Sequence, residues 1–412
     1  TAFGISAERL TSMYGSTLQI ALRSRRMPDC CIVGGGVIGL SIARELAGRG
    51  RSVTVVSHDT LRKSASWAAA GIFPAQPRDT LTDYNGTPIE RLTQYSDRLH
   101  EQWTKSLLEE TGIDNGFRRC GSLAMATTEE TASQIQADEK KWKRLRVKHE
   151  SLSPTDLSDI EPVLHSTVIT RQVRKAFYLP DETQVRPPRH LAALRSACLT
   201  RGVEILDGHH VQNFEFDSSR IVAINTEDQN STLQSICADQ FCIAAGAWSE
   251  QLLLKLDIEL PTKPWRGQIL LHKIEPGVLR HIINFGSGLN YIIPRDDGHL
   301  LIGSTIEDVG FDSSTTPSSL YRINKIAGEI LPDVIANEPV ASWAGLRPGS
   351  PDGLPTVGRI PSADNAWLAT GHYRSGFHLS TGTARLVSDS MCGIPTQIQL
   401  DDFSPIRSGL RR

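Results

Sequence analysis

Apolar positions near the start of the chain follow the pattern of a strand, a helix and a second strand. Cys31–Val33 is a short apolar run that ends in glycines, as a buried parallel strand does before a turn. From Val37 to Arg49 the apolar residues recur on one helical face, and Val53–Val56 is a second apolar run. The pattern predicts a strand–helix–strand unit.

A second buried strand of this kind is predicted far along the chain, at Phe241–Ala244. This distance indicates a sheet built from discontinuous pieces, with the residues between them inserted. The insertion shows helical periodicity over 83–111 and 190–202. Alternating runs then predict an antiparallel meander of three strands, Val211–Phe216, Arg220–Thr226 and Gln234–Asp239.

The last third of the chain reads mostly as strands. Strands are predicted at Gln268–His272, Leu289–Pro294, His299–Ser304 and Trp367–Ala369. Helices are predicted at Ser319–Leu331 and Leu379–Met391. Ser342–Arg359 is rich in Gly and Pro, so we expect it to be mostly loop.

The glycines of the predicted strand–helix–strand unit indicate a nucleotide-binding turn. Gly34, Gly36 and Gly39 have the G-x-G-x-x-G spacing. The first allows a tight turn, the second lets a pyrophosphate approach the backbone, and the third lets the helix pack closely on the strand. The N-terminus of the helix offers N–H groups to the phosphates. This spacing within this unit predicts a bound dinucleotide.

The identity of the dinucleotide is left open by Ser57. An acid is expected at this position to hold the ribose hydroxyls, whereas Ser57 offers a hydrogen bond without the charge. Ser57 with Arg62 and Lys63 nearby also fits a 2′-phosphate pocket, which would mean NADP.

Composition narrows the function classes. With 412 residues, 39% hydrophobic and 22% charged, we expect a soluble globular chain of two domains. The net charge of −2 gives no indication of a nucleic-acid partner or an anionic membrane surface, and no apolar run approaches the roughly 20 residues of a membrane span. Seven scattered cysteines favour a reducing compartment, and we expect the cytoplasm. The adjacent His209 and His210 point to opposite faces of a strand, so no metal site is predicted.

Residues 1–26 look separate from the fold. They carry four arginines, many Ser and Thr and a single acid, as a transit peptide does. The interpretation we favour is an over-extended start, with translation beginning at Met27, because no amphipathic helix with a cleavage site stands out.

Seven segments occur together and in order: GGGVIG, SWAAAGIF, AAGAWS, RGQIL, NYIIPRDDGHLLIGSTIEDVGFD, WAGLRPGSPDGLPTVGR and GHYRSGFHLSTGTA. They resemble the D-amino-acid oxidase superfamily of flavoenzymes, and within it the glycine oxidase branch that feeds thiamine biosynthesis. The resemblance spans about residues 28–405. It implies an α/β fold of two domains, a Rossmann-like FAD-binding domain of the glutathione-reductase type and a substrate-binding domain with an antiparallel sheet. We expect 27–82, 174–262 and 344–405 in the first, 83–173 and 263–343 in the second, and 1–26 as an extension.

The resemblance implies FAD, which answers the question that Ser57 left open. Most of the family has a glutamate at that position, so Ser57 is a departure that weakens the expected ribose contact. Relatives with covalent flavin use a cysteine near Gly349, and Arg347–Asp352 contains none, so we expect non-covalent FAD. Leu301 stands where sarcosine oxidases carry a lysine, which argues against that branch. The residues implied to surround FAD are Gly34, Gly36, Val37, Ile38, Gly39, Ser57, Ser66, Ala69, Ala70, Gly71, Ala245, Gly246, Trp248, Gly345, Gly371, Tyr373, Ser375 and Gly376.

The resemblance also implies three substrate residues. Arg347 matches the arginine that binds the substrate carboxylate, for which a guanidinium supplies two parallel donors. Tyr291 matches the tyrosine whose hydroxyl supports the same carboxylate. Arg374 matches an arginine beside the flavin, and either a substrate or gating contact or a structural pairing fits it.

The implied reaction is oxidation of glycine, or of another small amine or D-amino acid, to a 2-oxo acid, ammonia and hydrogen peroxide, with O2 as second substrate. The residues leave three rivals open: a D-amino-acid dehydrogenase or sarcosine-oxidase-like enzyme with another electron acceptor, an NADP-linked enzyme, and a nucleotide-binding protein without catalysis. The resemblance further implies a homo-oligomer, often a tetramer.

Overall fold

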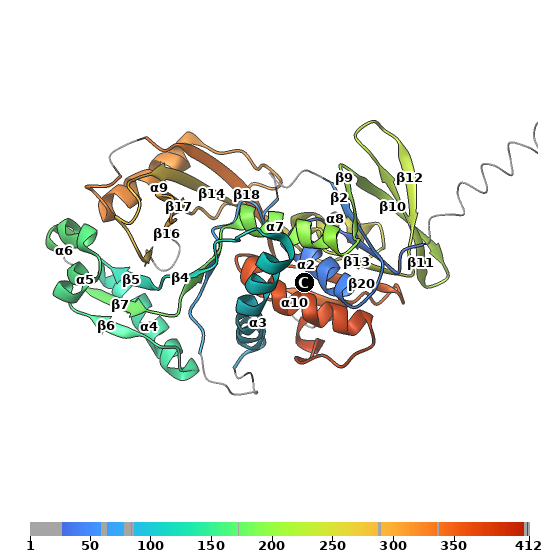
Figure 1. Ribbon diagram of the computed structural model, residues 1–412, viewed down its shortest axis with the longest axis horizontal. Coiled ribbons are helices and arrows are strands. Elements are labelled where there is room, and N and C mark those ends of the chain that lie inside the picture. Colours follow the sequence, from blue (N-terminus) through green and yellow to red (C-terminus); the bar gives the residue numbers. More distant parts are fainter. Residues whose placement is uncertain are drawn as a thin grey trace, which may run out of the picture.

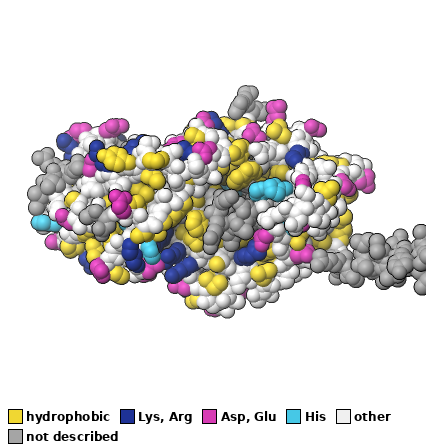
Figure 2. Space-filling model, turned by 90° about the horizontal axis from the view of Figure 1, so that it is seen from above, with side chains coloured by type: hydrophobic (Ala, Val, Ile, Leu, Met, Phe, Trp, Pro, Cys, Tyr) yellow, Lys and Arg dark blue, Asp and Glu magenta, His cyan; other side chains and the backbone are white. Residues whose placement is uncertain are grey.

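The computed structural model describes residues 27–58, 64–77, 84, 86–171, 173–286, 290–335, 338–407 and 410. Two large sheets lie side by side, each with its own helices (Figure 1). Residues 1–26, Arg62 and Lys63, on which predictions were made, lie outside the described residues. Acidic and basic side chains both occur across the face shown in Figure 2, in line with the net charge of −2.

The first sheet has six strands and confirms the predicted α/β architecture. Its order is β19 (Thr356–Arg359), β20 (Ala366–Thr370), β13 (Gln240–Ile243), β1 (Cys30–Val33), β2 (Val53–Ser57) and β9 (Glu204–Asp207). β1 pairs in parallel with β2 on one side and with β13 on the other. Strands from distant parts of the chain therefore meet at its centre, as the second buried run indicated.

Helices α2 (Val37–Gly48), α3 (Pro88–Thr111), α7 (Pro187–Thr200) and α10 (Gly376–Met391) pack against one another beside this sheet. α3 begins where Thr87 and Glu90 form a capping box, with the Thr87 N–H donating to Glu90 Oε2 at 2.9 Å. It ends at Gly112, whose φ of +69° favours glycine. The hydrophobic residues of its buried face are Leu92, Tyr95, Trp103 and Leu107.

The predicted meander is confirmed as β10 (His210–Asp217), β11 (Arg220–Glu227) and β12 (Leu233–Cys237), paired antiparallel. A small sheet joins β3 (Ile72–Phe73), β8 (Thr183–Gln184) and β4 (Arg118–Arg119). The remaining described helices are α4 (Glu129–Leu145), α5 (Pro154–Ile160), α6 (His165–Arg171), α8 (Ser249–Leu254), α9 (Pro317–Ile330) and the 3₁₀ turns η2 (Pro162–Leu164), η3 (Gly246–Trp248) and η4 (Asp401–Phe403).

The second large sheet has eight strands. Its order is β18 (Ala341–Gly349), β14 (Lys263–Lys273), β17 (His299–Gly303), β16 (Asn290–Pro294), β15 (Ile282–Phe285), β5 (Ser122–Ala126), β7 (Lys175–Leu179) and β6 (Glu150–Leu152). Neighbours are antiparallel except β15 and β5, which are parallel. α9 packs on β14 and β17, and α4 packs on β5.

Three sequence predictions are wrong in this region. Most of the expected loop Ser342–Arg359 is strand, because β18 pairs with β14 from Ala341 to Gly349, and an edge strand tolerates Pro and Gly. α3 belongs with the six-stranded sheet, since it packs on α10, while β7 belongs with the eight-stranded one. The predicted division put 83–111 in the substrate-binding domain and 174–179 in the FAD-binding domain. Periodicity shows that one face of an element is buried, but it does not show which element covers that face.

Among the described helices, none is both long and apolar enough to cross a membrane.

Candidate active site

A cavity of about 1110 Å³ lies between the carboxyl ends of the parallel strands and one face of the eight-stranded sheet. The glycine turn after β1 lines one end, and Tyr291 and Arg347 line the other. In open parallel sheets, ligands bind at the carboxyl ends of the strands. The fold thus brings the predicted nucleotide motif and the predicted substrate residues to one cavity.

The turn between β1 and α2 is built so that only glycine fits. Gly34 has a φ of +121°, and a Cβ there would overlap the Ala244 carbonyl at the end of β13. A Cβ on Gly39 would overlap the carbonyl oxygen of Gly34. Ser66 Oγ accepts a hydrogen bond from the Val37 N–H at 3.0 Å, at the N-terminus of α2. This backbone cradle and the helix N-terminus beside it fit a dinucleotide pyrophosphate.

Ser57 ends β2 and is 8% exposed. A Cβ on Gly35 would lie 2.7 Å from Ser57 Oγ, so the small side chain packs directly under the turn. Beside Ser57, the imidazole rings of His58 and His210 lie edge to face with their centroids 3.5 Å apart, and both residues line the cavity. Sequence reasoning missed this pair, because the end of β2 and the start of β10 meet only in the fold.

The structure places most of the residues implied to contact FAD on the cavity wall. The lining residues are Gly34, Gly36, Val37, Ile38, Ser57, Ser66, Ala69, Ala70, Gly71, Ala245, Gly246, Trp248, Gly345, Tyr373, Ser375 and Gly376. Gly39 lies behind the turn, and Gly371, with a φ of +76°, lies against the Thr356 N–H group. Their contacts with the cofactor stay predictions.

Arg347 lies on β18 with its guanidinium against the eight-stranded sheet. Nη1 donates to the Thr305 carbonyl at 2.9 Å, and Nη2 donates to Ser304 Oγ at 3.0 Å. Gly267 on β14 makes room for it, because a Cβ there would overlap the guanidinium. Burial lowers the pKa of Arg347 from its ordinary value of 12.5. A half-buried cation held by neutral acceptors is suited to receiving a carboxylate.

Tyr291 lies on β16 and is 6% exposed. Its cross-strand partner is Gly303, and a Cβ on Gly303 would lie 2.5 Å from the tyrosine oxygen. Glycines at 267 and 303 therefore create the space that Arg347 and Tyr291 occupy. The electrostatic contribution of Tyr291 to the pKa of Arg347 is upward but smaller than the downward effect of burial, so the pKa remains lowered.

Arg374 lies in the turn before α10 and lines the same cavity. Its positive charge contributes to lowering the pKa of Arg347. The preceding Tyr373 has a φ of +46°, an uncommon conformation for a non-glycine residue. The choice between a substrate contact and a structural pairing for Arg374 stays open.

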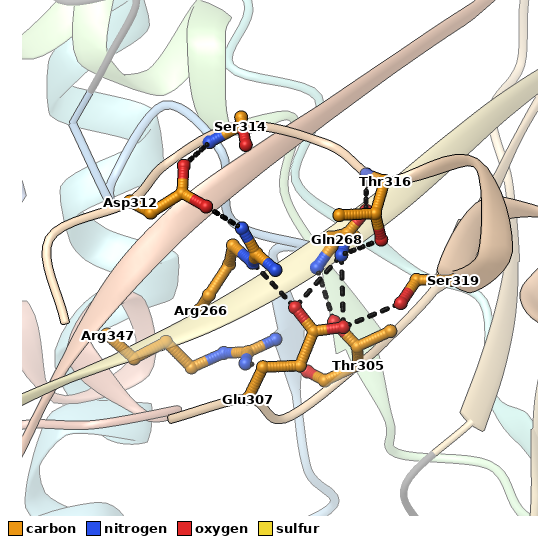
Figure 3. Close-up of polar contacts among 9 residues, drawn as sticks. All are labelled: Arg266, Gln268, Thr305, Glu307, Asp312, Ser314, Thr316, Ser319 and Arg347. Atoms are coloured by element: carbon orange, nitrogen blue, oxygen red, sulfur yellow. Dashed lines mark hydrogen bonds and ion pairs between the residues drawn. The ribbon is translucent and has the colours of Figure 1, made fainter. Parts of the chain in front are cut away.

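An ionic network holds the segment that supports Arg347 (Figure 3). Arg266, 5% exposed in its side chain, donates to Glu307 Oε2 at 2.6 Å and to Asp312 Oδ2 at 2.5 Å. The Gln268 side chain donates to Glu307 and accepts from the Thr316 N–H at 2.8 Å, while the Gln268 N–H donates to Thr305 Oγ1 at 3.0 Å. Sequence reasoning missed this network. The feature of the sequence that could have indicated this network is the run of polar residues that follows β17.

Residues 29–390 match the model of the DAO family, described as FAD dependent oxidoreductase. The chain is 34% identical over 376 residues to glycine oxidase of Pseudomonas aeruginosa, covering 91% of this chain and 97% of that one. It is 33% identical over 372 residues to the bifunctional protein ThiO/ThiG of Trichormus variabilis, covering 88% of this chain and 52% of that one. The crystal structure of glycine oxidase from Geobacillus kaustophilus superposes with a TM-score of 0.84, at 31% identity over 93% of this chain and 99% of that chain.

Proposed function

The chain belongs to the DAO family of FAD-dependent oxidoreductases, and we propose that it is a glycine oxidase-type enzyme. It would convert glycine, or another small primary or secondary amine, to the 2-oxo acid, ammonia and hydrogen peroxide. For glycine the oxo acid is glyoxylate. The glycine oxidase relatives, which match along nearly their whole length, support this choice.

The observation that carries the proposal is the position of Arg347. It is a half-buried guanidinium whose acceptors among the described residues are the neutral Thr305 carbonyl and Ser304 hydroxyl. Five N–H groups are available on a guanidinium, so donors remain for a bidentate carboxylate. Tyr291 shares the cavity wall and offers a hydroxyl to the same group.

The residues of this chain would act by positioning. Arg347 holds the acid end of the substrate, which fixes the direction of its Cα–H bond. FAD, when bound, supplies the chemistry that removes a hydride from that carbon and passes the electrons to O2. The amine must be neutral for this step, so the rate is expected to rise with pH. No side chain is required as a general base, and water hydrolyses the imine product to oxo acid and ammonia.

The mode of cofactor binding and the place of the reaction are parts of the same proposal. FAD is expected to be non-covalent, because Arg347–Asp352 contains no cysteine. The similarity to the bifunctional protein ThiO/ThiG, whose ThiO belongs to thiamine biosynthesis, supports a role in supplying thiamine thiazole synthesis. All seven cysteines are free, which supports a cytoplasmic location. A homo-oligomer, such as a tetramer, is expected and is measured by light scattering.

A peroxide-coupled assay with glycine, sarcosine and D-alanine tests the activity. Glycine-dependent peroxide from a yellow, flavin-containing protein is the expected result. Reduction of a quinone or dye without peroxide would favour a dehydrogenase instead. A colourless protein that binds NADP would overturn the proposal.

A further inference from the structure

The cavity ends, beside the six-stranded sheet, in a group of histidines that the proposed reaction does not use. Ser57 is the last residue of β2, and its carbonyl accepts a hydrogen bond from the His209 N–H at 3.0 Å. The rings of His58 and His210 are in contact next to it. Lys255, one residue after α8, donates from Nζ to a backbone carbonyl of β10 at 3.4 Å. These five residues all line the cavity, and we call them the histidine end.

The position of Ser57 relates the histidine end to the adenosine of the cofactor. In nucleotide-binding sheets of this kind, the residue that ends the second strand meets the ribose, and an acid there binds the 2′-hydroxyl. β2 is that strand, because it pairs in parallel with β1, which leads into the glycine turn. Ser57 packs directly under this turn, since a Cβ on Gly35 would lie 2.7 Å from Ser57 Oγ. The histidine end therefore lies where the ribose of FAD is expected.

Acidic side chains of the described cavity wall lie away from the histidine end. They are Asp138 on α4 and Glu182 after β7, both beside the eight-stranded sheet. Asp207 on β9 is paired with Ser57 in the strand register, but it is not among the residues that line the cavity. Its carboxylate accepts from Arg195 Nη1 at 3.0 Å, so its charge is already compensated. The charge of the histidine end comes from Lys255 and from whichever imidazoles are protonated.

This chemistry differs from that of a site with an acid at the ribose. A carboxylate accepts a hydrogen bond from the 2′-hydroxyl and repels a phosphate in its place. Hydroxyl and imidazole groups can donate to a phosphate oxygen, and the ammonium group of Lys255 adds a positive charge. The side chains of His58 and His210 are exposed, so a ligand that enters the cavity can reach them.

We propose that the histidine end accepts a phosphate on the ribose, so that adenine nucleotides with a 2′-phosphate bind at the cofactor site and compete with FAD. FAD remains the cofactor, and the phosphorylated nucleotide is a competitor that lowers the fraction of flavin-loaded protein. The inference concerns the cofactor end of the cavity, and it does not depend on which amine is oxidised.

Displacement of FAD from the full-length holoenzyme tests this inference. The protein is incubated with a nucleotide, and the released flavin is separated by filtration and measured by absorbance. 5′-AMP and 2′,5′-ADP differ only in the 2′-phosphate, and NAD and NADP form a second pair with the same difference. At constant ionic strength, the 2′-phosphorylated member of each pair is expected to release half of the flavin at about tenfold lower concentration than its partner.

Variants assign the effect to the histidine end. Ser57→Glu introduces the acid and should lower the advantage of the 2′-phosphate by about tenfold or more. Lys255→Gln removes a cation and should lower the advantage by about threefold. Lys325→Gln, which removes an exposed cation on α9, is the matched control and should keep the wild-type ratio. If Ser57→Glu fails to fold or to hold FAD, Lys255→Gln and the wild-type ratio still decide.

Three outcomes overturn the inference. The first is displacement by the 2′-phosphorylated nucleotides that is equal to or weaker than displacement by their partners. The second is an advantage that survives the substitutions at Ser57 and Lys255, because the phosphate then binds elsewhere. The third is that no nucleotide releases FAD, because the site then does not accept a free adenine nucleotide. Each of these outcomes leaves the proposed amine oxidation to be decided by the peroxide assay.

Discussion

The two ends of the cavity are built in different ways. The cofactor end is a local structure, in which one turn between β1 and α2 presents backbone N–H groups and its glycines exclude side chains. The substrate end is assembled from strands far apart in sequence, and its chemistry lies in side chains on β16 and β18. A backbone site is therefore specified by a short motif, whereas a side-chain site is specified by sheet pairing.

This difference predicts that the two ends fail separately. Changes at the substrate end should affect the binding and turnover of the amine while FAD is retained. Changes at the cofactor end should lower both the binding of FAD and the stability of the folded protein. Four substitutions test this division, in decreasing order of expected effect.

The largest effect is expected for Arg347→Ala. The substrate carboxylate would lie buried without its partner, which costs about 3–5 kcal/mol, or roughly 10²–10⁴-fold in kcat/KM for glycine. The ratio of flavin to protein, read from absorbance, should stay at the wild-type value. Arg347→Lys keeps the charge but loses the bidentate geometry, so its activity should lie between the two. Loss of flavin together with activity would show that the ends are not separable.

Gly39→Ala tests the cofactor end. Its Cβ would overlap the Gly34 carbonyl, so α2 must move away from the turn, and overpacking of this kind costs about 1–3 kcal/mol. Both the flavin content and the midpoint of thermal unfolding should fall. Gly328→Ala is the matched control, a helical glycine on α9 with open space around its Cβ position. It should be neutral or stabilising by up to about 1 kcal/mol. Equal effects of Gly39→Ala and Gly328→Ala would show that the turn has no special requirement for glycine at position 39.

The sequence predicted the cofactor end in more detail than the substrate end. The spacing of Gly34, Gly36 and Gly39 predicts the turn from local sterics, and the discontinuous sheet follows from two buried apolar runs. Arg347 and Tyr291 were assigned roles only through the family resemblance. Their chemistry depends on Gly267 and Gly303, which make space for them only once β14 and β17 pair with their neighbours.

Other features were beyond sequence reasoning for a related reason. The Gly and Pro content of the edge strand β18 predicts a loop, because composition carries no information about the pairing with β14. The helix α3 and the strand β7 were assigned to the wrong halves, since periodicity does not identify a packing partner.

Glu307→Gln is expected to have a smaller effect than the first two changes, confined to the substrate end. It weakens the ion pair of the buried Arg266, at a cost of about 2 kcal/mol in the free energy of unfolding. Thr305 and Ser304, which hold Arg347, lie two and three residues before Glu307, so KM for glycine should rise several-fold with flavin content unchanged. Asp312→Asn is the control, and its effect should be smaller because the Asp312 side chain is 52% exposed. An unchanged KM would show that the ionic network does not determine the position of Arg347.

The smallest effect is expected at a contact between the two halves. Glu90 caps α3, beside the six-stranded sheet, and pairs at 2.6 Å with Arg144 on α4, beside the eight-stranded one. The hydrogen bond from Arg144 lowers the pKa of Glu90 from 4.5 to about 2. Because the folded-state pKa is the lower one, this stabilisation is fully present above about pH 4.5 and is lost as the pH falls toward 2.

Glu90→Gln should therefore cost about 1 kcal/mol at neutral pH, since Arg144 is half exposed and solvent screens the pair. Urea unfolding of the wild type and the variant measures this, and the difference should shrink as the pH is lowered from about 5 to about 3. Glu130→Gln, on the exposed start of α4, should leave the pH profile unchanged. A difference that stays constant with pH would assign the loss to the capping box with Thr87 rather than to the ion pair between the halves. In that case the halves are joined by packing and by the shared cavity rather than by this charge pair.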